Sequence, residues 1–344
     1  MQRIVVPWSA LVCMQLAVGV GCGGTGSEAG GTAPTFDASE EAADSSPPLP
    51  EAGVDGDVDV VSEPLVDSAK EPDAEAGADL DAAAEAEAEA SPPKTSGAFA
   101  ALTYNVAGLP QGISSSDPAK NTPLISPKLN PFDLVMVQED FAYHAQLVSQ
   151  ATHPYKTTHK SGSINLGDGV SILSRIELGP DIHVPWKACN GYVDDSNDCL
   201  TPKGFVVTTM TLAAGAVVDL YDLHADAGGS NGDMSARSKQ MDQLVAYIAD
   251  HSAGKAVIVA GDTNMHDEDE DQLVKLMTGA GLTDACRALS CPEPYRIDRV
   301  LYRGGTAVTL TATQWRVDMT FVDGEGNQLS DHEPVAVDFT WAVP

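Results

Sequence analysis

Ala256-Val-Ile-Val-Ala-Gly-Asp-Thr-Asn264 combines an apolar run with a carboxylate and an amide that follow it. The run Ala256 to Ala260 has the length and composition of a buried strand. Asp262 and Asn264 lie in the loop that follows, where rigid scaffolds tend to carry their chemistry. The stretch predicts an α/β domain with a functional site at its strand ends.

The chain from Gly97 onward repeats this pattern and adds two amphipathic helices. Met241, Leu244 and Ile248 fall at helical spacing and predict a helix from Ser235 to Asp250. Leu273, Leu276 and Met277 predict a second helix, and we expect both apolar stripes to be core. The other predicted strands are Phe99 to Val106, Asp133 to Gln138, Val170 to Ser174, Gly204 to Leu212, Val217 to Leu223, Ile297 to Tyr302 and Val335 to Trp341.

The segment from residue 23 to residue 96 has a different composition. It is dominated by Ala, Glu, Asp, Pro, Gly and Ser, and Phe36 is its one aromatic residue. Such a segment buries too little apolar surface to offset its ordering entropy, so we expect a disordered linker. The chain has a formal net charge of −31. The linker supplies roughly half of the excess acid, and the acidity argues weakly against DNA as a partner.

The first 22 residues predict export. Arg3 precedes an apolar run from Ile4 to Gly21, which ends in small residues beside Cys22. The segment Val18 to Cys22 resembles a bacterial lipobox in which Cys22 is lipidated, and plain signal cleavage nearby is the alternative. A transmembrane anchor is disfavoured because the run is barely long enough to span and contains Pro7 and several Gly. We expect an extracellular protein or one anchored at the cell surface, such as an outer-membrane lipoprotein.

The cysteines beyond the signal agree with export. They form two short-range pairs, which predict disulfides Cys189 to Cys199 and Cys286 to Cys291. A structural zinc site is the competing interpretation, but the spacing lacks CxxC and no histidines cluster nearby.

Four short motifs bear chemistry in a fixed order. Each motif alone occurs by chance in many proteins, but their order and their position beside apolar strands are specific. They are Leu102-Thr-Tyr-Asn105, Val137-Gln138-Glu139, Ala260-Gly-Asp262-Thr-Asn264 and Ser330-Asp331-His332.

This order resembles the endonuclease/exonuclease/phosphatase superfamily over essentially all of residues 97 to 344. The resemblance implies a four-layer, deoxyribonuclease-like α/β sandwich, with two packed mixed β-sheets flanked by helices. It also implies that Asn105 and Glu139 hold Mg²⁺, that Asp262 and Asn264 flank the attacking water and the phosphate, and that Asp331 and His332 complete the acid/base set.

Two further segments extend the resemblance. Tyr221-Asp-Leu-His224 resembles the family's histidine segment, which implies that His224 binds phosphate or protonates the leaving oxygen. Arg296-Ile-Asp298 resembles the family's strand that begins with Asp, which implies that Asp298 supports the metal site or the opposite histidine.

The residue types suit phosphodiester hydrolysis. An attacking water needs a cation to draw charge from the phosphoryl oxygens and a base to remove its proton. Mg²⁺ accepts oxygen ligands, so a carboxylate and an amide suffice, and Mn²⁺ or Co²⁺ could substitute. His332 has a pKa suited to proton transfer, and Asp331 or Asp262 could set its tautomer. The sequence leaves open whether Asp262 or His332 is the base.

The segment Asp198-Cys-Leu-Thr-Pro-Lys203-Gly204 indicates the substrate. It resembles the Asp and Lys-Gly segment of neutral sphingomyelinases, which implies that Asp198 contacts Lys203 and that Lys203 reaches phosphate. A disulfide-pinned loop with a surface lysine is the alternative. Tyr143 and His144 could reach substrate or pack as the first turn of a helix. We therefore predict a monomeric sphingomyelinase-like phospholipase C that acts on a phospholipid or sphingolipid.

Other functions stay open. The alternatives are a secreted deoxyribonuclease, a surface-tethered binding module without turnover, and a phosphomonoesterase acting on inositol phosphates or lipids. The sequence shows no added Lys and Arg cluster for several phosphates and no adjacent Trp and Phe for membrane entry. A lipid anchor at Cys22 would hold the enzyme near a bilayer instead.

Overall fold

The structure, a computed structural model, describes residues 94–114, 116–162, 166–192 and 198–344. The predicted signal, the lipidation position and nearly all of the predicted linker lie outside the described residues. The first strand begins at Ser96, one residue before the expected start of the domain. Among the residues described, no helix has the length and apolar character needed to cross a membrane.

Two sheets form the centre of the domain, and each mixes parallel and antiparallel pairs. The first contains β1 (Ser96–Asn105), β2 (Leu134–Gln138), β3 (Tyr155–Lys156), β4 (Ser171–Ser174), β11 (Thr309–Val317) and β12 (Val335–Ala342). The second contains β5 (Ile182–Pro185), β6 (Gly204–Ala213), β7 (Ala216–His224), β8 (Ala256–Asp262), β9 (Thr283–Asp284) and β10 (Asp298–Arg303). The strand orders are β11-β12-β1-β2-β4-β3 and β5-β6-β7-β8-β10-β9.

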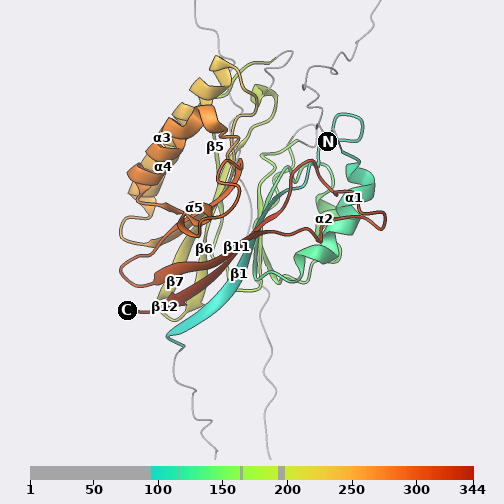
Figure 1. The fold of residues 1–344 in the computed structure, drawn as a ribbon. Helices are drawn as coiled ribbons and strands as arrows, with labels where there is room; N and C mark the ends of the chain where they lie inside the picture. The colour runs from blue at the N-terminus through green and yellow to red at the C-terminus, as the bar shows by residue number, and fades with distance from the viewer. Residues whose placement is uncertain (1–93, 115, 163–165, 193–197) are drawn as a thin grey trace, which may run out of the picture. The chain divides into compact units, whose positions relative to one another are not determined.

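Helices cover the outer face of each sheet, as Figure 1 shows. The helices of the described residues are α1 (Pro118–Ile125), α2 (His144–Val148), α3 (Asn231–His251), α4 (Glu270–Ala280) and α5 (Ala285–Ala288), with 3-10 turns η1 (Ser126–Leu129), η2 (Asp198–Leu200) and η3 (Asp267–Asp269). The short α5 packs Ala285 into the core between the two sheets. The short helices α1 and α2 lie on the first sheet, and α3 and α4 lie on the second. The predicted four-layer α/β sandwich is confirmed.

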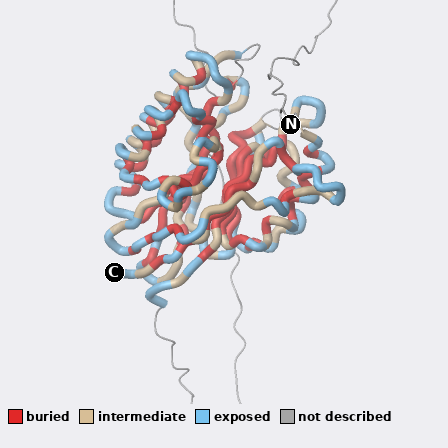
Figure 2. The backbone as a smooth tube through the Cα atoms, viewed as in Figure 1, coloured by how far each residue is buried: buried red, intermediate tan, exposed pale blue. Residues whose placement is uncertain are grey.

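The apolar runs are continuous because both faces of the central strands are buried. In β8, Ile258 and Ala260 face the other sheet, whereas Val257 and Val259 pack under α3 and α4. Alternate residues of a strand point to opposite faces, so one strand serves two cores. Figure 2 shows this burial along the adjoining strands of the two sheets.

Some boundaries and elements differ from the sequence prediction. Helix α3 begins four residues earlier than expected, because Ser230 and Asp233 exchange capping hydrogen bonds and so satisfy its first turn. The edge strand β11 was not predicted from the sequence. Its outward residues are polar and only alternate positions near its start are buried, so it lacks a continuous apolar run. Helix α1, with Pro123 inside it, also escaped prediction.

Candidate active site

The candidate residues gather where strand ends of the two sheets meet. In the second sheet, His224, Asp262 and Asp298 are direct neighbours on β7, β8 and β10. In the first sheet, Asn105 pairs with Gln138, so Glu139 emerges beside it. Asp298 is the first residue of β10 and the Ser330-Asp331-His332 motif precedes β12, because β10 and β12 run antiparallel to their neighbours and begin where those strands end.

Three residues at these strand ends have left-handed backbone conformations. The φ angles are 50° for Ala107, 58° for Glu139 and 49° for Asn264. Residues other than glycine adopt this region at an energetic cost, and such strain concentrates at functional sites. Glu139 follows β2 directly, and its side chain accepts from the Asn105 amide, which also donates to Asp262 of the second sheet.

Asn105 connects the two sheets through its amide. Its Nδ2 atom donates to Glu139 Oε1 at 3.1 Å and to Asp262 Oδ2 at 3.0 Å. Its Oδ1 atom accepts from the Ala107 backbone N–H at 3.0 Å, and its carbonyl accepts from the Ser330 hydroxyl at 2.7 Å. Asn105 is fully buried, so these bonds fix its side chain and align both carboxylates.

His332 lies between two buried carboxylates. Its Nδ1 atom is 2.9 Å from Asp298 Oδ2, and its Nε2 atom is 3.7 Å from Asp262 Oδ2. Burial lowers the pKa of His332, but Asp262 and Asp298 outweigh it and raise the pKa to about 10. Asp298 therefore holds the ring, whereas Asp331 is exposed and accepts a hydrogen bond from Ser330.

His224 has the opposite electrostatic state. Its Nε2 atom lies 3.5 Å from Asp262 Oδ2, and its ring is fully enclosed. Burial, aided by the positive charge of Lys203, holds the pKa of His224 well below its usual value. Burial would raise the pKa of Asp262, yet the two histidines lower it overall. The site thus combines a neutral His224, an ionised Asp262 and a protonated His332.

Asn264 is positioned by the loop that follows β8. Its backbone N–H donates to Asp262 Oδ1 at 3.0 Å, and its Nδ2 donates to the Ala225 carbonyl at 3.2 Å. The same carbonyl accepts from Lys203 Nζ at 3.3 Å. The carbonyl of the residue that follows His224 thus holds both Asn264 and Lys203.

Lys203 forms the predicted contact with Asp198, and both side chains are largely buried. Asp226 and Asp233 lie next to this pair, with ligand atoms of the three carboxylates within 4.8 Å of one another. Burial and the charge of Asp198 raise the pKa of Asp226 to about 7. No sequence motif indicated a role for Asp226 or Asp233, although Asp226 lies only two residues after His224.

The carboxylates could hold a divalent cation. Asp262, Asp298 and His332 present ligand atoms within 4.8 Å of one another, and Asn105 links Glu139 to Asp262. Burial raises the pKa of Glu139 despite the opposing charge of Lys203. A cation beside Glu139 would offset this cost, and a set rich in oxygen atoms suits Mg²⁺.

The remaining predicted residues occupy supporting positions. His144 is the first residue of α2 and its ring bonds to Asp140, while the Tyr143 hydroxyl accepts from the Gln111 backbone at 3.0 Å. The two residues thus lie at the start of a helix, as one of the two alternatives expected, and a contact with substrate stays a prediction. Both predicted disulfides, Cys189–Cys199 and Cys286–Cys291, are present.

Sequence comparison identifies relatives of this chain. The profile described as the Endonuclease/Exonuclease/phosphatase family matches residues 102–332. Proteins named sphingomyelinase from Mycobacterium bovis and Mycobacterium tuberculosis are each 34% identical over 272 residues, which cover 72% of this chain and 54% of theirs. The chain therefore spans about half the length of these curated relatives.

Structural comparison identifies the same fold in solved proteins. A beta toxin of Staphylococcus aureus with bound magnesium ions has a TM-score of 0.52 and 16% identity, covering 70% of this chain and 98% of its own. Sphingomyelinase C of Streptomyces griseocarneus has a TM-score of 0.51 and 18% identity, covering 70% and 99%. TDP2 of D. rerio, complexed with a single-strand DNA product, has a TM-score of 0.55 and 18% identity, and the match covers 70% of this chain and 98% of TDP2. At these identities the likeness shows the fold alone.

Proposed function

Because the chain belongs to the Endonuclease/Exonuclease/phosphatase family, we propose that it is a Mg²⁺-dependent phosphodiesterase acting as a sphingomyelinase-like phospholipase C. The observation that carries the chemistry is the network in which Asn105 joins Glu139 to Asp262, beside His332. The observation that favours lipid is the buried Asp198–Lys203 pair, together with 34% identity to mycobacterial sphingomyelinases. The product would be a phosphorylated head group such as phosphocholine.

We assign the metal to Glu139 and Asn105, with Asp298 supporting the site. When bound, Mg²⁺ would draw negative charge from the phosphoryl oxygens, and Mn²⁺ or Co²⁺ could replace it. The Asn105 Nδ2 atom faces the carboxylates, so a bond from its oxygen to the cation would require the amide to turn and to exchange its hydrogen bonds with Glu139, Asp262 and Ala107 for that bond. Enclosed carboxylates with strained backbone support are the environment expected of such a site.

The protonation states favour Asp262 as the base. Asp262 is ionised, whereas His332 holds a proton between two carboxylates. Asp262 would accept the proton of the attacking water, and His332 would give its proton to the leaving oxygen. Charge-assisted donors strengthen as negative charge develops on the substrate, so a protonated His332 favours the transition state.

Lys203 and Asn264 are proposed to orient the phosphate. Lys203 is held by Asp198 and by the Ala225 carbonyl, so its charge is fixed beside His224. Asn264 is held to the same carbonyl. His224, being neutral, can donate a hydrogen bond to a phosphoryl or leaving oxygen without adding charge.

We also propose that the protein is exported. The disulfides Cys189–Cys199 and Cys286–Cys291 are typical of an oxidising compartment. Lipidation of Cys22 would bring the enzyme to a membrane surface, as its sequence context suggests.

The function is tested by offering the full chain sphingomyelin vesicles and plasmid DNA side by side, with Mg²⁺ or with EDTA. We expect phosphocholine release that stops in EDTA, with the plasmid intact. Nicked DNA with intact lipid would replace the substrate by nucleic acid, and turnover of neither would favour the binding-module alternative.

A further inference from the structure

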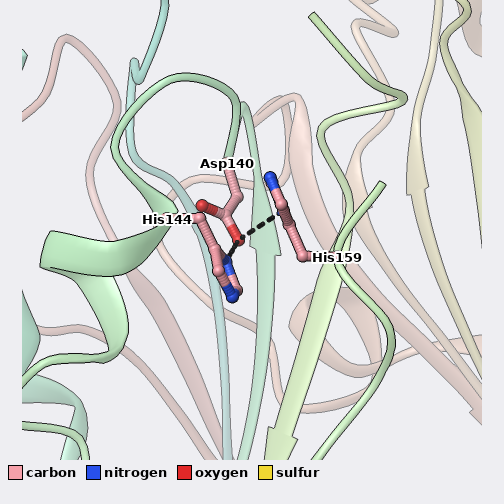
Figure 3. Close-up of side chains that lie close together, drawn as sticks. All are labelled: Asp140, His144 and His159. Atoms are coloured by element: carbon pink, nitrogen blue, oxygen red, sulfur yellow. Dashed lines mark hydrogen bonds and ion pairs between the residues drawn. The ribbon is translucent and has the colours of Figure 1, made fainter. Parts of the chain in front are cut away.

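Two histidines converge on the buried carboxylate that follows Glu139. Figure 3 shows the rings of His144 and His159 next to the Asp140 carboxylate, with dashed lines from both to one of its oxygens. Asp140 comes directly after the turn at the end of β2, His144 begins α2, and His159 lies beyond β3. Three separate segments therefore supply one cluster, outside the set of residues proposed for catalysis.

The contacts focus on a single oxygen. His144 Nδ1 lies 2.6 Å from Asp140 Oδ2, and His159 Nδ1 lies 3.7 Å from the same atom. The two rings stack with centroids 4.0 Å apart. One ligand atom from each residue falls within 4.8 Å of the others. The Ser171 hydroxyl donates to the same Asp140 oxygen at 2.7 Å, which fixes the carboxylate.

Ion pairing alone does not account for this arrangement. A hydrogen bond between Asp140 and His144 accounts for one ring only. His159 Nδ1 lies 3.7 Å from the same oxygen, which is beyond hydrogen-bonding distance. A divalent cation resolves this, because two neutral ring nitrogens and one carboxylate can all bind it.

We propose that Asp140, His144 and His159 form a second metal site, distinct from the catalytic centre, that takes Zn²⁺ or a similar transition metal. Two imidazoles and one carboxylate favour such ions over Mg²⁺, which prefers oxygen ligands. Binding requires each stacked ring to tilt about its Cβ–Cγ bond. It releases to solvent any proton that the rings hold.

The burial and the hydrogen bonds around Asp140, His144 and His159 suit a structural metal ion. The Asp140 side chain is 1% exposed, whereas those of His144 and His159 are 25% and 19% exposed, so an ion can enter from solvent. Ser171, on β4, supplies the outer hydrogen bond that commonly orients a ligating group. The site would tie α2 and the segment after β3 to the turn that carries Glu139.

The experiment is Co²⁺ titration of the full, metal-depleted chain in excess Mg²⁺, followed by visible absorption. Four-coordinate Co²⁺ with nitrogen ligands absorbs far more strongly than Co²⁺ in a six-coordinate oxygen site. We expect such a spectrum at one equivalent, and its loss on addition of Zn²⁺. X-ray absorption of the Zn²⁺-loaded native chain should show two imidazole ligands, which tests the site without any substitution.

Matched variants locate the signal. His144→Ala and His159→Ala should each lower Co²⁺ affinity by at least about tenfold. His332→Ala, at the catalytic centre, and His251→Ala, on the exposed surface of α3, should retain the signal. If the Co²⁺ spectrum is retained in His144→Ala and His159→Ala but lost in His332→Ala, the metal binds at the catalytic centre and the proposal is wrong. Absence of the spectrum in the native chain would leave the cluster as an ion pair and overturn the proposal.

Discussion

Asp298 Oδ2 lies 2.9 Å from His332 Nδ1, which makes Asp298 the residue that orients this imidazole. Asp298→Asn removes one of the two carboxylates that raise the pKa of His332 to about 10. We expect the pKa of His332 to fall by at least about one unit, since an opposite charge at this range favours the protonated ring. NMR titration of its ring protons in the metal-depleted chain checks this. An unchanged pKa would assign the shift to Asp262 alone.

Glu139→Gln tests the proposed metal ligand. The substitution keeps the shape of the side chain and can preserve a contact with Asn105, but it removes the charge. We expect turnover at saturating Mg²⁺ to fall by at least about 10³-fold, because a Lewis-acid cation contributes several kcal/mol to the transition state. The exposed Glu325→Gln is the matched control. Full activity of Glu139→Gln with an unchanged melting temperature would remove Glu139 from the metal site.

The sequence predicted the strands that are buried on both faces, because their apolar runs do not depend on distant partners. Ala256 to Ala260 and Asp133 to Gln138 fall within one or two residues of β8 and β2. The edge strand β11 and the short α1 carry little local signal, because their stability comes from packing against residues distant in sequence. Propensity is a weak guide where tertiary contacts decide.

The candidate site was predicted as a set of residues but not as a network. Strand-end motifs placed Asn105 and Asp262 at one edge, and the structure adds the hydrogen bond between them across 157 residues of chain. His159 had no motif and no helical spacing to link it to Asp140. The contact depends on how the segment after β3 folds back toward Asp140, and no short sequence motif indicates this.

Asp226→Asn should change the pH dependence of stability. Asp226 has a folded-state pKa of about 7, raised by burial and by Asp198, so the folded state binds a proton that the unfolded state loses near pH 4. The native chain therefore loses stability as pH rises from about 4 to about 7. At pH 8, Asp226→Asn should be more stable than the native chain by on the order of 4 kcal/mol, since the folded-state pKa of Asp226 lies about three units above its ordinary value. Urea unfolding of both chains at pH 5 and pH 8 measures this, and parallel profiles would contradict it.

Arg237→Met should destabilise the domain strongly. Arg237 forms two hydrogen bonds with Asp269, at 3.1 and 2.7 Å, and both side chains are about 1% exposed. Its removal leaves a buried carboxylate without its cation, at a cost of about 3–5 kcal/mol. Lys275→Met breaks the exposed pair with Asp242 and should cost less than about 1 kcal/mol. Similar losses in denaturant unfolding would mean that burial does not set the strength of these pairs.

Lys203→Met separates phosphate orientation from general support of the fold. Lys203 pairs with Asp198 and lies beside His224, so its loss should weaken hydrolysis of sphingomyelin more than that of a small aryl phosphodiester. The reason is that a large substrate must be oriented by remote contacts, which a small one lacks. Asp198→Asn leaves the lysine present but releases it, and the double variant should lose little beyond Lys203→Met, because both changes act through one charge. Ratios of kcat/KM for the two substrates, measured in all four chains, give the result. Equal losses on both substrates would assign Lys203 to folding or to chemistry common to all phosphodiesters, and would remove the argument that this pair selects lipid.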